Sequence, residues 1–244
     1  MMTIGLLPPR GRVLVLDLDD TLYLERDYVC SGLRAVDLAV QRLYSVEGFF
    51  ECAMAEFNTG RRAFLFDTVL SRLGLAATPD VITGLVSVYR EHEPAIQLQP
   101  DAVDFLAQAR PDYELAILTD GYFVSQRNKI RALGLDRIGI FPIVCTDSWG
   151  RRYWKPHVRG FRHIQSHHRV AAEACVYIAD NPAKDFIAPR RLGWRTVQIK
   201  RPERIHMAAS ERAGLVADCE VESLAGLSPA RLDQLMSGRG ERAA

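Results

Sequence analysis

The sequence lacks the features that direct a chain to a membrane or to a polyanion. Its apolar runs fall well short of the ~20 residues of a membrane span, and no basic region precedes an apolar segment in the opening MMTIGLLPPR. Lys and Arg number 31 against 30 Asp and Glu, so the net charge is only +1. We therefore expect a cytoplasmic monomer or homodimer that binds neither nucleic acid nor membrane and holds any anion at a local site.

Cysteine pairs and zinc motifs are missing as well. The five cysteines are odd in number and scattered, with no CxxC and no Cys/His spacing typical of zinc sites. We interpret them as reduced thiols. His163, His167 and His168 have helical spacing but no evident carboxylate nearby, so we assign no metal to them.

Short apolar segments of strand length alternate with helical patterns along most of the chain. The predicted strands are Val13–Leu16, Leu115–Leu118, Ile140–Cys145, Cys175–Ala179 and Thr196–Ile199. Alternation of this kind predicts an α/β fold with a doubly wound, parallel, Rossmann-like sheet. With 244 residues, 48% of them hydrophobic, the chain has room for one core and a smaller second unit.

Residues 22–99 break the alternation, because no convincing strand occurs there. Asp27 is the expected cap of one helix, and a second spans Arg61–Leu73. Thr78 is the expected N-cap of a third. We therefore predict a small all-helical domain at 22–99, inserted in a catalytic core of 1–21 and 100–244.

The acidic segment DLDDT directly follows the first predicted strand. Asp17 and Asp19, two apart in an extended segment, can point into one site, although turns after strands are often rich in Asp. The second strand ends in Thr119, Asp120 and Gly121, where a hydroxyl and the backbone N–H groups of a helix start suit an anion. A Thr before a helix is also a common cap.

Two further segments carry charge at expected strand ends. Lys155 is one of few lysines in a chain whose cations are mostly arginine, and it stands before Pro156 and a helix. A solvated loop charge is the alternative. Asp180 leaves the fourth strand and Asp185 follows five residues later, an oxygen set suited to Mg²⁺. A helix cap by Asp180 is the alternative there.

Together, DLDDT, LTDG, KP and ADNPAKD occur in this order at strand ends and resemble the four motifs of the haloacid dehalogenase-like superfamily. The resemblance covers almost the whole predicted core. It implies that the helical insertion is a cap domain of the type placed between the first two motifs. One departure is Ala179, where the family commonly has glycine.

The resemblance also implies residue roles. Asp17 would be the nucleophile, Asp19 the general acid and base, and Thr119 and Lys155 the phosphoryl ligands. Leu18, Asp120 and Gly121 would complete the substrate-binding loops. Mg²⁺ would be held by Asp17, the Asp19 backbone carbonyl and Asp180, with Asp185 supporting this metal site.

The function expected from this resemblance is Mg²⁺-dependent hydrolysis of a small phosphate monoester, a nucleotide or a sugar phosphate, through an aspartyl phosphate. Asp19 favours phosphate chemistry, because dehalogenases of the superfamily lack an acid/base Asp at this position. A phosphomutase is an alternative. A non-catalytic phosphoryl-responsive module fits less well, because receiver domains place the phosphoacceptor after the third strand and have no helical insertion.

Overall fold

The computed structural model describes residues 11–205 and 216–238, and the chain divides into two compact units. The first comprises 11–24, 98–123, 134–205 and 216–238. The second comprises 25–97 together with 124–133. Residues 124–133, which follow the second strand, therefore group with the helical insertion, although residues 98–123 separate the two segments in the sequence.

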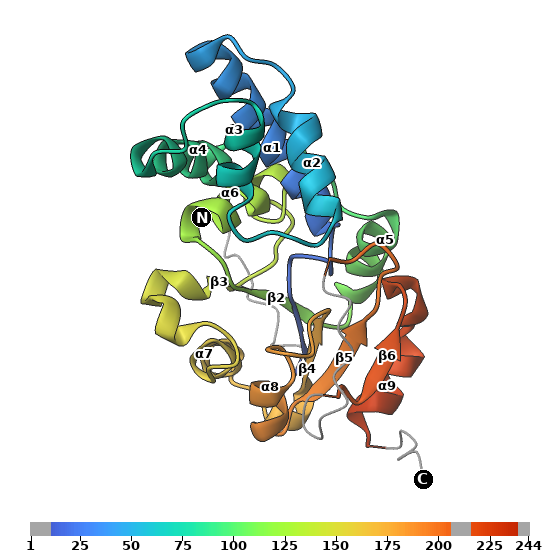
Figure 1. Cartoon of the computed structure of the whole chain (residues 1–244). Coiled ribbons are helices and arrows are strands. Elements are labelled where there is room, and N and C mark those ends of the chain that lie inside the picture. The colour runs from blue at the N-terminus through green and yellow to red at the C-terminus, as the bar shows by residue number, and fades with distance from the viewer. Residues whose placement is uncertain (1–10, 206–215, 239–244) are drawn as a thin grey trace, which may run out of the picture. The chain divides into compact units, whose positions relative to one another are not determined.

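The first unit is built on a six-stranded sheet in the order β3-β2-β1-β4-β5-β6, with every neighbouring pair parallel (Figure 1). The strands are β1 (Val13–Leu16), β2 (Glu114–Thr119), β3 (Ile143–Cys145), β4 (Cys175–Ala179), β5 (Arg195–Ile199) and β6 (Cys219–Val221). The order reverses beside β1, so the carboxyl ends of β1, β2 and β4 meet at the switch point where such sheets bind ligands. The predicted fold class is confirmed.

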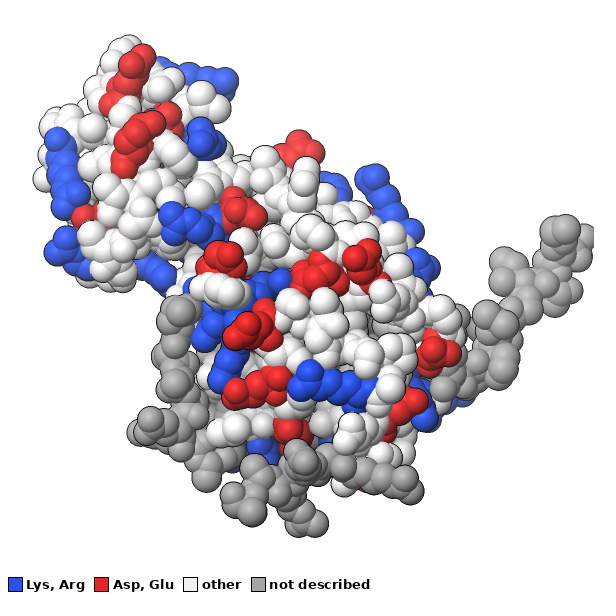
Figure 2. All heavy atoms as spheres, turned by 90° about the vertical axis from the view of Figure 1, so that its right-hand side faces the viewer, with Lys and Arg blue, Asp and Glu red and all other residues white. Residues whose placement is uncertain are grey.

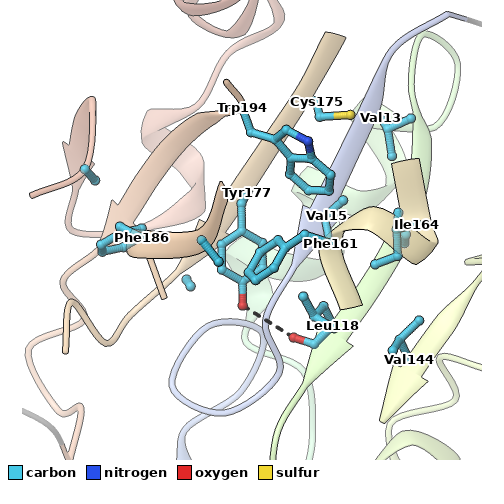
Figure 3. Close-up of a cluster of buried hydrophobic side chains, with 14 residues drawn as sticks. Val13, Val15, Leu118, Val144, Phe161, Ile164, Cys175, Tyr177, Phe186 and Trp194 are labelled. Atoms are coloured by element: carbon cyan, nitrogen blue, oxygen red, sulfur yellow. Dashed lines mark hydrogen bonds between the residues drawn. The ribbon is translucent and has the colours of Figure 1, made fainter. Parts of the chain in front are cut away.

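Helices cover both faces of this sheet (Figure 1). They are α5 (Pro100–Ala109), α7 (Arg159–His168), α8 (Ile187–Arg191) and α9 (Pro229–Met236), with 3₁₀ turns η1 (Thr146–Trp149), η2 (Arg151–Tyr153), η3 (Ala172–Ala174) and η4 (Leu224–Gly226). Alternate residues Val13 and Val15 of β1 join Phe161 and Ile164 of α7 in a buried cluster (Figure 3). Each such side chain contributes about 1.5–3 kcal/mol through burial.

The chain leaves and re-enters the first unit at adjacent points. After β1, the Leu18 carbonyl accepts hydrogen bonds from the N–H groups of Thr21 and Leu22, at 3.4 and 3.0 Å, which closes a turn. The Gln99 N–H then donates to the Leu22 carbonyl at 2.9 Å. Both connections to the helical insertion therefore lie side by side, a few residues from Asp17.

The second unit consists of helices α1 (Glu25–Tyr44), α2 (Phe49–Asn58), α3 (Leu65–Arg72) and α4 (Pro79–Glu91), with most of α6 (Phe123–Ala132). Helices α1 and α4 approach closely at Gly32, where an added Cβ would lie 2.5 Å from the Tyr89 ring. Helix α6 is tied to the end of α4, because Ser125 Oγ donates to the Arg90 carbonyl at 3.0 Å and the Asn128 amide to the Glu91 carbonyl at 3.0 Å.

Charged side chains of both signs are interspersed on the face in Figure 2 and form no single field, in keeping with the net charge of +1. In the described part of the chain, no helix combines the length and apolar character that a membrane crossing requires.

Candidate active site

A buried ion-pair cluster links the ends of β1 and β4 to the segment after β3. Asp17 directly follows β1, and its N–H donates to the Ile178 carbonyl of β4 at 2.9 Å. The Lys155 ammonium lies 2.9 Å from Asp17 Oδ1 and 2.7 Å from Asp185 Oδ1. All three side chains are almost completely buried. The structure thus brings together three residues that are far apart in the sequence.

Asp180, at the end of β4, completes a group of three carboxylates. Ligand oxygens of Asp17, Asp180 and Asp185 all lie within 4.8 Å of one another. Burial, reinforced by the charges of Asp185 and Asp17, raises the pKa of Asp180 to about 9. Burial also raises the pKa of Asp17 to about 6, although the Lys155 ammonium acts in the opposite direction. Burial and mutual repulsion therefore hold protons on these carboxyl groups at pH values where an exposed aspartate is ionised.

This group has the properties of a site for a hard cation. Lys155 bonds to Asp17 and Asp185, whereas Asp180 Oδ2 is buried with no hydrogen-bond partner among the described residues. A buried carboxylate oxygen without a partner is costly unless a cation or donor satisfies it. Carboxylate oxygens are the ligands that Mg²⁺ prefers, so the residues present fit this ion.

Asp19 and Thr119 lie at the same edge of the sheet. Asp19 Oδ1 accepts a hydrogen bond from the Tyr23 hydroxyl, within the turn that follows β1. The register pairs Leu16 of β1 with Ile117 of β2, so Thr119 ends β2 level with the residues just after β1. Thr119 is fully buried, and its hydroxyl donates to the Asp120 carbonyl at a long 3.4 Å.

The Asp120 carboxylate supports the segment that carries Lys155. Its two oxygens accept the Lys155 backbone N–H at 3.1 and 3.0 Å, and Oδ1 also accepts the Thr146 hydroxyl at 2.6 Å. Gly121 follows with φ of 122°, a conformation that residues with a Cβ rarely adopt. The Asp120 side chain is therefore already engaged in holding the segment that carries Lys155.

Two residues of this site were not among those selected from the sequence. The Tyr177 hydroxyl lies 2.9 Å from the Lys155 Nζ, and burial raises the pKa of this phenol well above its ordinary value, which keeps it neutral. The Lys184 ammonium is close enough to lower the pKa values of Asp17 and Asp180. Tyr177 reads as an ordinary strand residue in CVYIA. Lys184 had a signal, because it is one of four lysines and stands beside Asp185.

Comparison with known proteins gives one family match over most of the chain. A family model described as haloacid dehalogenase-like hydrolase matches residues 12–193. The chain is similar to the glyceraldehyde 3-phosphate phosphatase of Methanocaldococcus jannaschii, at 26% identity over 76% of this chain and 83% of that protein. It is also similar to the protein of the same name from Pyrococcus abyssi, at 27% identity over 78% of this chain and 81% of the relative.

Solved structures share the fold at lower identity. The hydrolase YfnB of Bacillus subtilis, bound to magnesium, has a TM-score of 0.64 at 19% identity and covers 88% of this chain and 96% of its own. A hydrolase of the same family from Deinococcus radiodurans, with bound phosphate and sodium, has a TM-score of 0.64 at 21% identity, over 94% and 98% of the two chains. A 2-haloacid dehalogenase from Pseudomonas syringae has a TM-score of 0.62 at 19% identity, over 91% and 98%.

Proposed function

Since the chain belongs to the haloacid dehalogenase-like hydrolase family, we propose that it hydrolyses small phosphate monoesters through an aspartyl phosphate formed on Asp17. Both curated relatives are named phosphatases, and the chain is a phosphoric monoester hydrolase. The observation that carries the mechanism is the contact of 2.9 Å between the buried Asp17 carboxylate and the Lys155 ammonium. A carboxylate can attack an anionic phosphoryl group only where cations offset their repulsion.

The reaction proceeds in two displacements. An Asp17 oxygen forms a bond to phosphorus while the ester oxygen leaves and takes a proton from Asp19. Asp19 then accepts a proton from the water that attacks the aspartyl phosphate, which releases inorganic phosphate and restores Asp17. Thr119 and Lys155 would hold the phosphoryl oxygens in line, as donors placed where negative charge is present. Proton transfer of this kind contributes about 10²–10⁴-fold in rate.

Magnesium is the cation that we expect at the carboxylate group. Asp17, Asp180 and the Asp19 backbone carbonyl would hold it, with Asp185 supporting this site. Three carboxylates face two ammonium groups, those of Lys155 and Lys184, before any phosphate dianion enters. Bound Mg²⁺ would supply the positive charge that lets the phosphate dianion bind beside these carboxylates.

Asp19 is the feature that favours phosphate over halide chemistry within this fold. The fold alone does not decide, because a 2-haloacid dehalogenase shares it with phosphate-binding hydrolases. For the substrate, sugar phosphates and nucleoside monophosphates are the two classes that we propose. The names of the curated relatives make glyceraldehyde 3-phosphate the first compound to test.

Phosphate release from a panel of monoesters tests this function. The panel contains glyceraldehyde 3-phosphate, other sugar phosphates and nucleoside 5′-monophosphates, each with Mg²⁺ and with EDTA. We expect at least one compound to release inorganic phosphate with Mg²⁺ and to release none with EDTA, and Asp17→Asn serves as the inactive control. Undiminished turnover in EDTA would contradict the metal requirement. Isomerisation of a sugar phosphate without phosphate release would identify a phosphomutase instead.

A further inference from the structure

The hydroxyl of Tyr177 belongs to the reacting end of the sheet, although its ring belongs to the core. The ring is fully buried and packs edge-on against Phe161, with ring centroids 4.9 Å apart (Figure 3). The hydroxyl lies 2.9 Å from Lys155 Nζ and 3.4 Å from both the Leu118 carbonyl and Asp185 Oδ1. One side chain thus connects β4, the end of β2 and the buried lysine.

The Lys155 ammonium has three N–H donors, and three acceptors surround it before a phosphoryl oxygen competes for one of these donors. Asp17 Oδ1, Asp185 Oδ1 and the Tyr177 hydroxyl lie at 2.9, 2.7 and 2.9 Å. Two of these acceptors are charged, and the third is neutral. A third carboxylate would add negative charge where a phosphate dianion must enter, whereas an apolar side chain would leave a buried donor unsatisfied.

We propose that Tyr177 is a positioning residue for the hydrolytic reaction, whose hydroxyl fixes the Lys155 ammonium between Asp17 and Asp185 without adding charge. The proposal rests on the proposed function, in which Lys155 binds the transferring phosphoryl group. Because the ring is held by Phe161 and by its place in β4, its hydroxyl is a rigid reference point. A flexible four-carbon lysine side chain needs such a point to place its charge.

The matched variants are Tyr177→Phe and Tyr113→Phe. Tyr113 is also buried, and its hydroxyl donates to Asp233 at 3.0 Å, outside the carboxylate group. Each variant removes one buried hydroxyl and leaves the ring. We expect Tyr177→Phe to lower kcat about tenfold with KM changed less than about threefold, because a displaced charge weakens the transition state more than substrate binding. Tyr113→Phe should retain the wild-type kcat, and thermal unfolding shows whether both variants fold.

A double-mutant cycle shows whether Tyr177 acts through Lys155. In a Lys155→Met background, measured under single turnover with enzyme in excess, the Tyr177→Phe change should lower the rate by less than about twofold. An equal loss in both backgrounds would overturn the positioning role, and so would an unchanged kcat in the single variant.

Nitrogen NMR of the lysine side chains tests the contact independently of activity. The chain has only four lysines, Lys129, Lys155, Lys184 and Lys200, so each ammonium can be assigned by substitution. We expect a slowly exchanging Lys155 signal in the wild type that moves or is lost in Tyr177→Phe and is unchanged in Tyr113→Phe. A wild-type Lys155 signal in fast exchange overturns the proposal without any variant. Failure of the panel assay with this signal intact would instead refute the proposed function.

Discussion

At the scale of single residues, the site contains carboxyl groups whose burial disfavours their ionised form. In the unfolded chain Asp17 and Asp180 titrate near 3.8, whereas burial raises their pKa values to about 6 and about 9 in the folded protein. At a pH between the unfolded and the folded pKa of each group, that aspartate keeps its proton in the folded chain and has lost it in the unfolded chain. The stability of the metal-free protein therefore falls as pH rises from about 4 toward about 9.

Magnesium should reverse this trend. Because the ion binds ionised carboxylates, its binding releases the protons held by Asp17 and Asp180, so its affinity rises with pH. We expect the Mg²⁺-induced rise in Tm to be larger at about pH 8 than at about pH 5.5. Differential scanning calorimetry with Mg²⁺ or EDTA measures it, and Asp180→Asn should remove most of the difference. An equal or larger rise at the lower pH would contradict this account of the carboxylates.

Asp19 can be tested through the leaving group. Asp19→Asn should lower kcat by about 10²–10⁴-fold for an alkyl monoester, because the departing alkoxide then receives no proton. For p-nitrophenyl phosphate, whose leaving group needs little protonation, the loss in the first displacement should be at least about tenfold smaller. Burst kinetics separate this step from hydrolysis of the aspartyl phosphate. Equal losses in aspartyl phosphate formation with both substrates would mean that Asp19 is not the acid.

The sequence showed the charged site residues better than the neutral one. Asp17 and Asp180 directly follow β1 and β4, Lys155 and Asp185 stand further along the segments after β3 and β4, and the structure brings all four together. Tyr177 lies inside a buried strand, where an aromatic residue is expected for packing alone. Only the three-dimensional contact with Lys155 distinguishes it from other core residues.

At the scale of elements, the turn after β1 is fixed by a residue of the segment that follows β5. The Arg201 guanidinium donates to the Thr21 carbonyl at 3.1 and 2.8 Å, and lies 3.0 Å from Asp101 at the start of α5. The Ile205 N–H also donates to the Asp20 carboxylate at 2.6 Å. These contacts hold the loop that carries Asp19, through Thr21, which is 180 residues away from Arg201 in sequence.

Replacing this arginine should destabilise the first unit. Arg201→Met leaves the buried Thr21 carbonyl and Asp101 without their partner, at a cost of about 3 kcal/mol in unfolding free energy. Lys200→Met is the adjacent control, because Lys200 pairs with Glu220 at the surface, where such pairs contribute about 0–1 kcal/mol. Urea denaturation measures both. If both variants lose a similar free energy of unfolding, the buried contacts of Arg201 stabilise the protein no more than a surface ion pair does.

Local signals predicted some elements and missed others. Thr78 does cap α4, accepting the Val81 N–H at 3.4 Å, as the Thr-Pro pair indicated. Helix α1 begins at Glu25, so Asp27 lies in its first turn rather than at its cap. The predicted helix at Arg61–Leu73 starts only at Leu65, after an exposed loop.

Tertiary pairing accounts for the remaining strand differences. Strand β6 (Cys219–Val221) has three residues and no alternation long enough to detect, and it forms because β5 offers an edge. Strand β3 begins at Ile143 rather than Ile140, since Pro142 has no N–H to give to the sheet.

At the scale of the whole molecule, the division into two units gives the helical unit a proposed role as a cap. The motivation lies in the first unit. The two connections to the helices are joined there by the hydrogen bond from the Gln99 N–H to the Leu22 carbonyl, and the Tyr23 hydroxyl donates to Asp19. A unit attached beside the reacting carboxylates can govern which substrate reacts and when water enters.

The loop at 59–64 is where we expect cap residues to affect specificity. It is exposed, and Phe64 is 78% exposed with φ of 57°, an unusual conformation for a large residue. Phe64→Ala and Arg62→Ala should change the ratio of kcat/KM between a triose phosphate and a nucleoside monophosphate by about tenfold. Thr119→Ser, in the core, should lower both values by a common factor.

Leu38→Ala is the control within the helical unit, because Leu38 is another exposed apolar residue, on α1. The ratio of kcat/KM between the two substrates should be the same in Leu38→Ala as in the wild type. If the loop variants also keep the wild-type ratio, 59–64 does not govern substrate choice.

The covalent intermediate tests the central claim most directly. The protein is mixed with a monoester that it hydrolyses, quenched in acid within one turnover, and treated with borohydride, which reduces an aspartyl phosphate to homoserine. Peptide mass spectrometry then locates the modified residue. The mechanism predicts homoserine at position 17, and none in Asp17→Asn or without substrate. Turnover with no modified residue, or modification at a different aspartate, would contradict the assignment of Asp17 as the nucleophile.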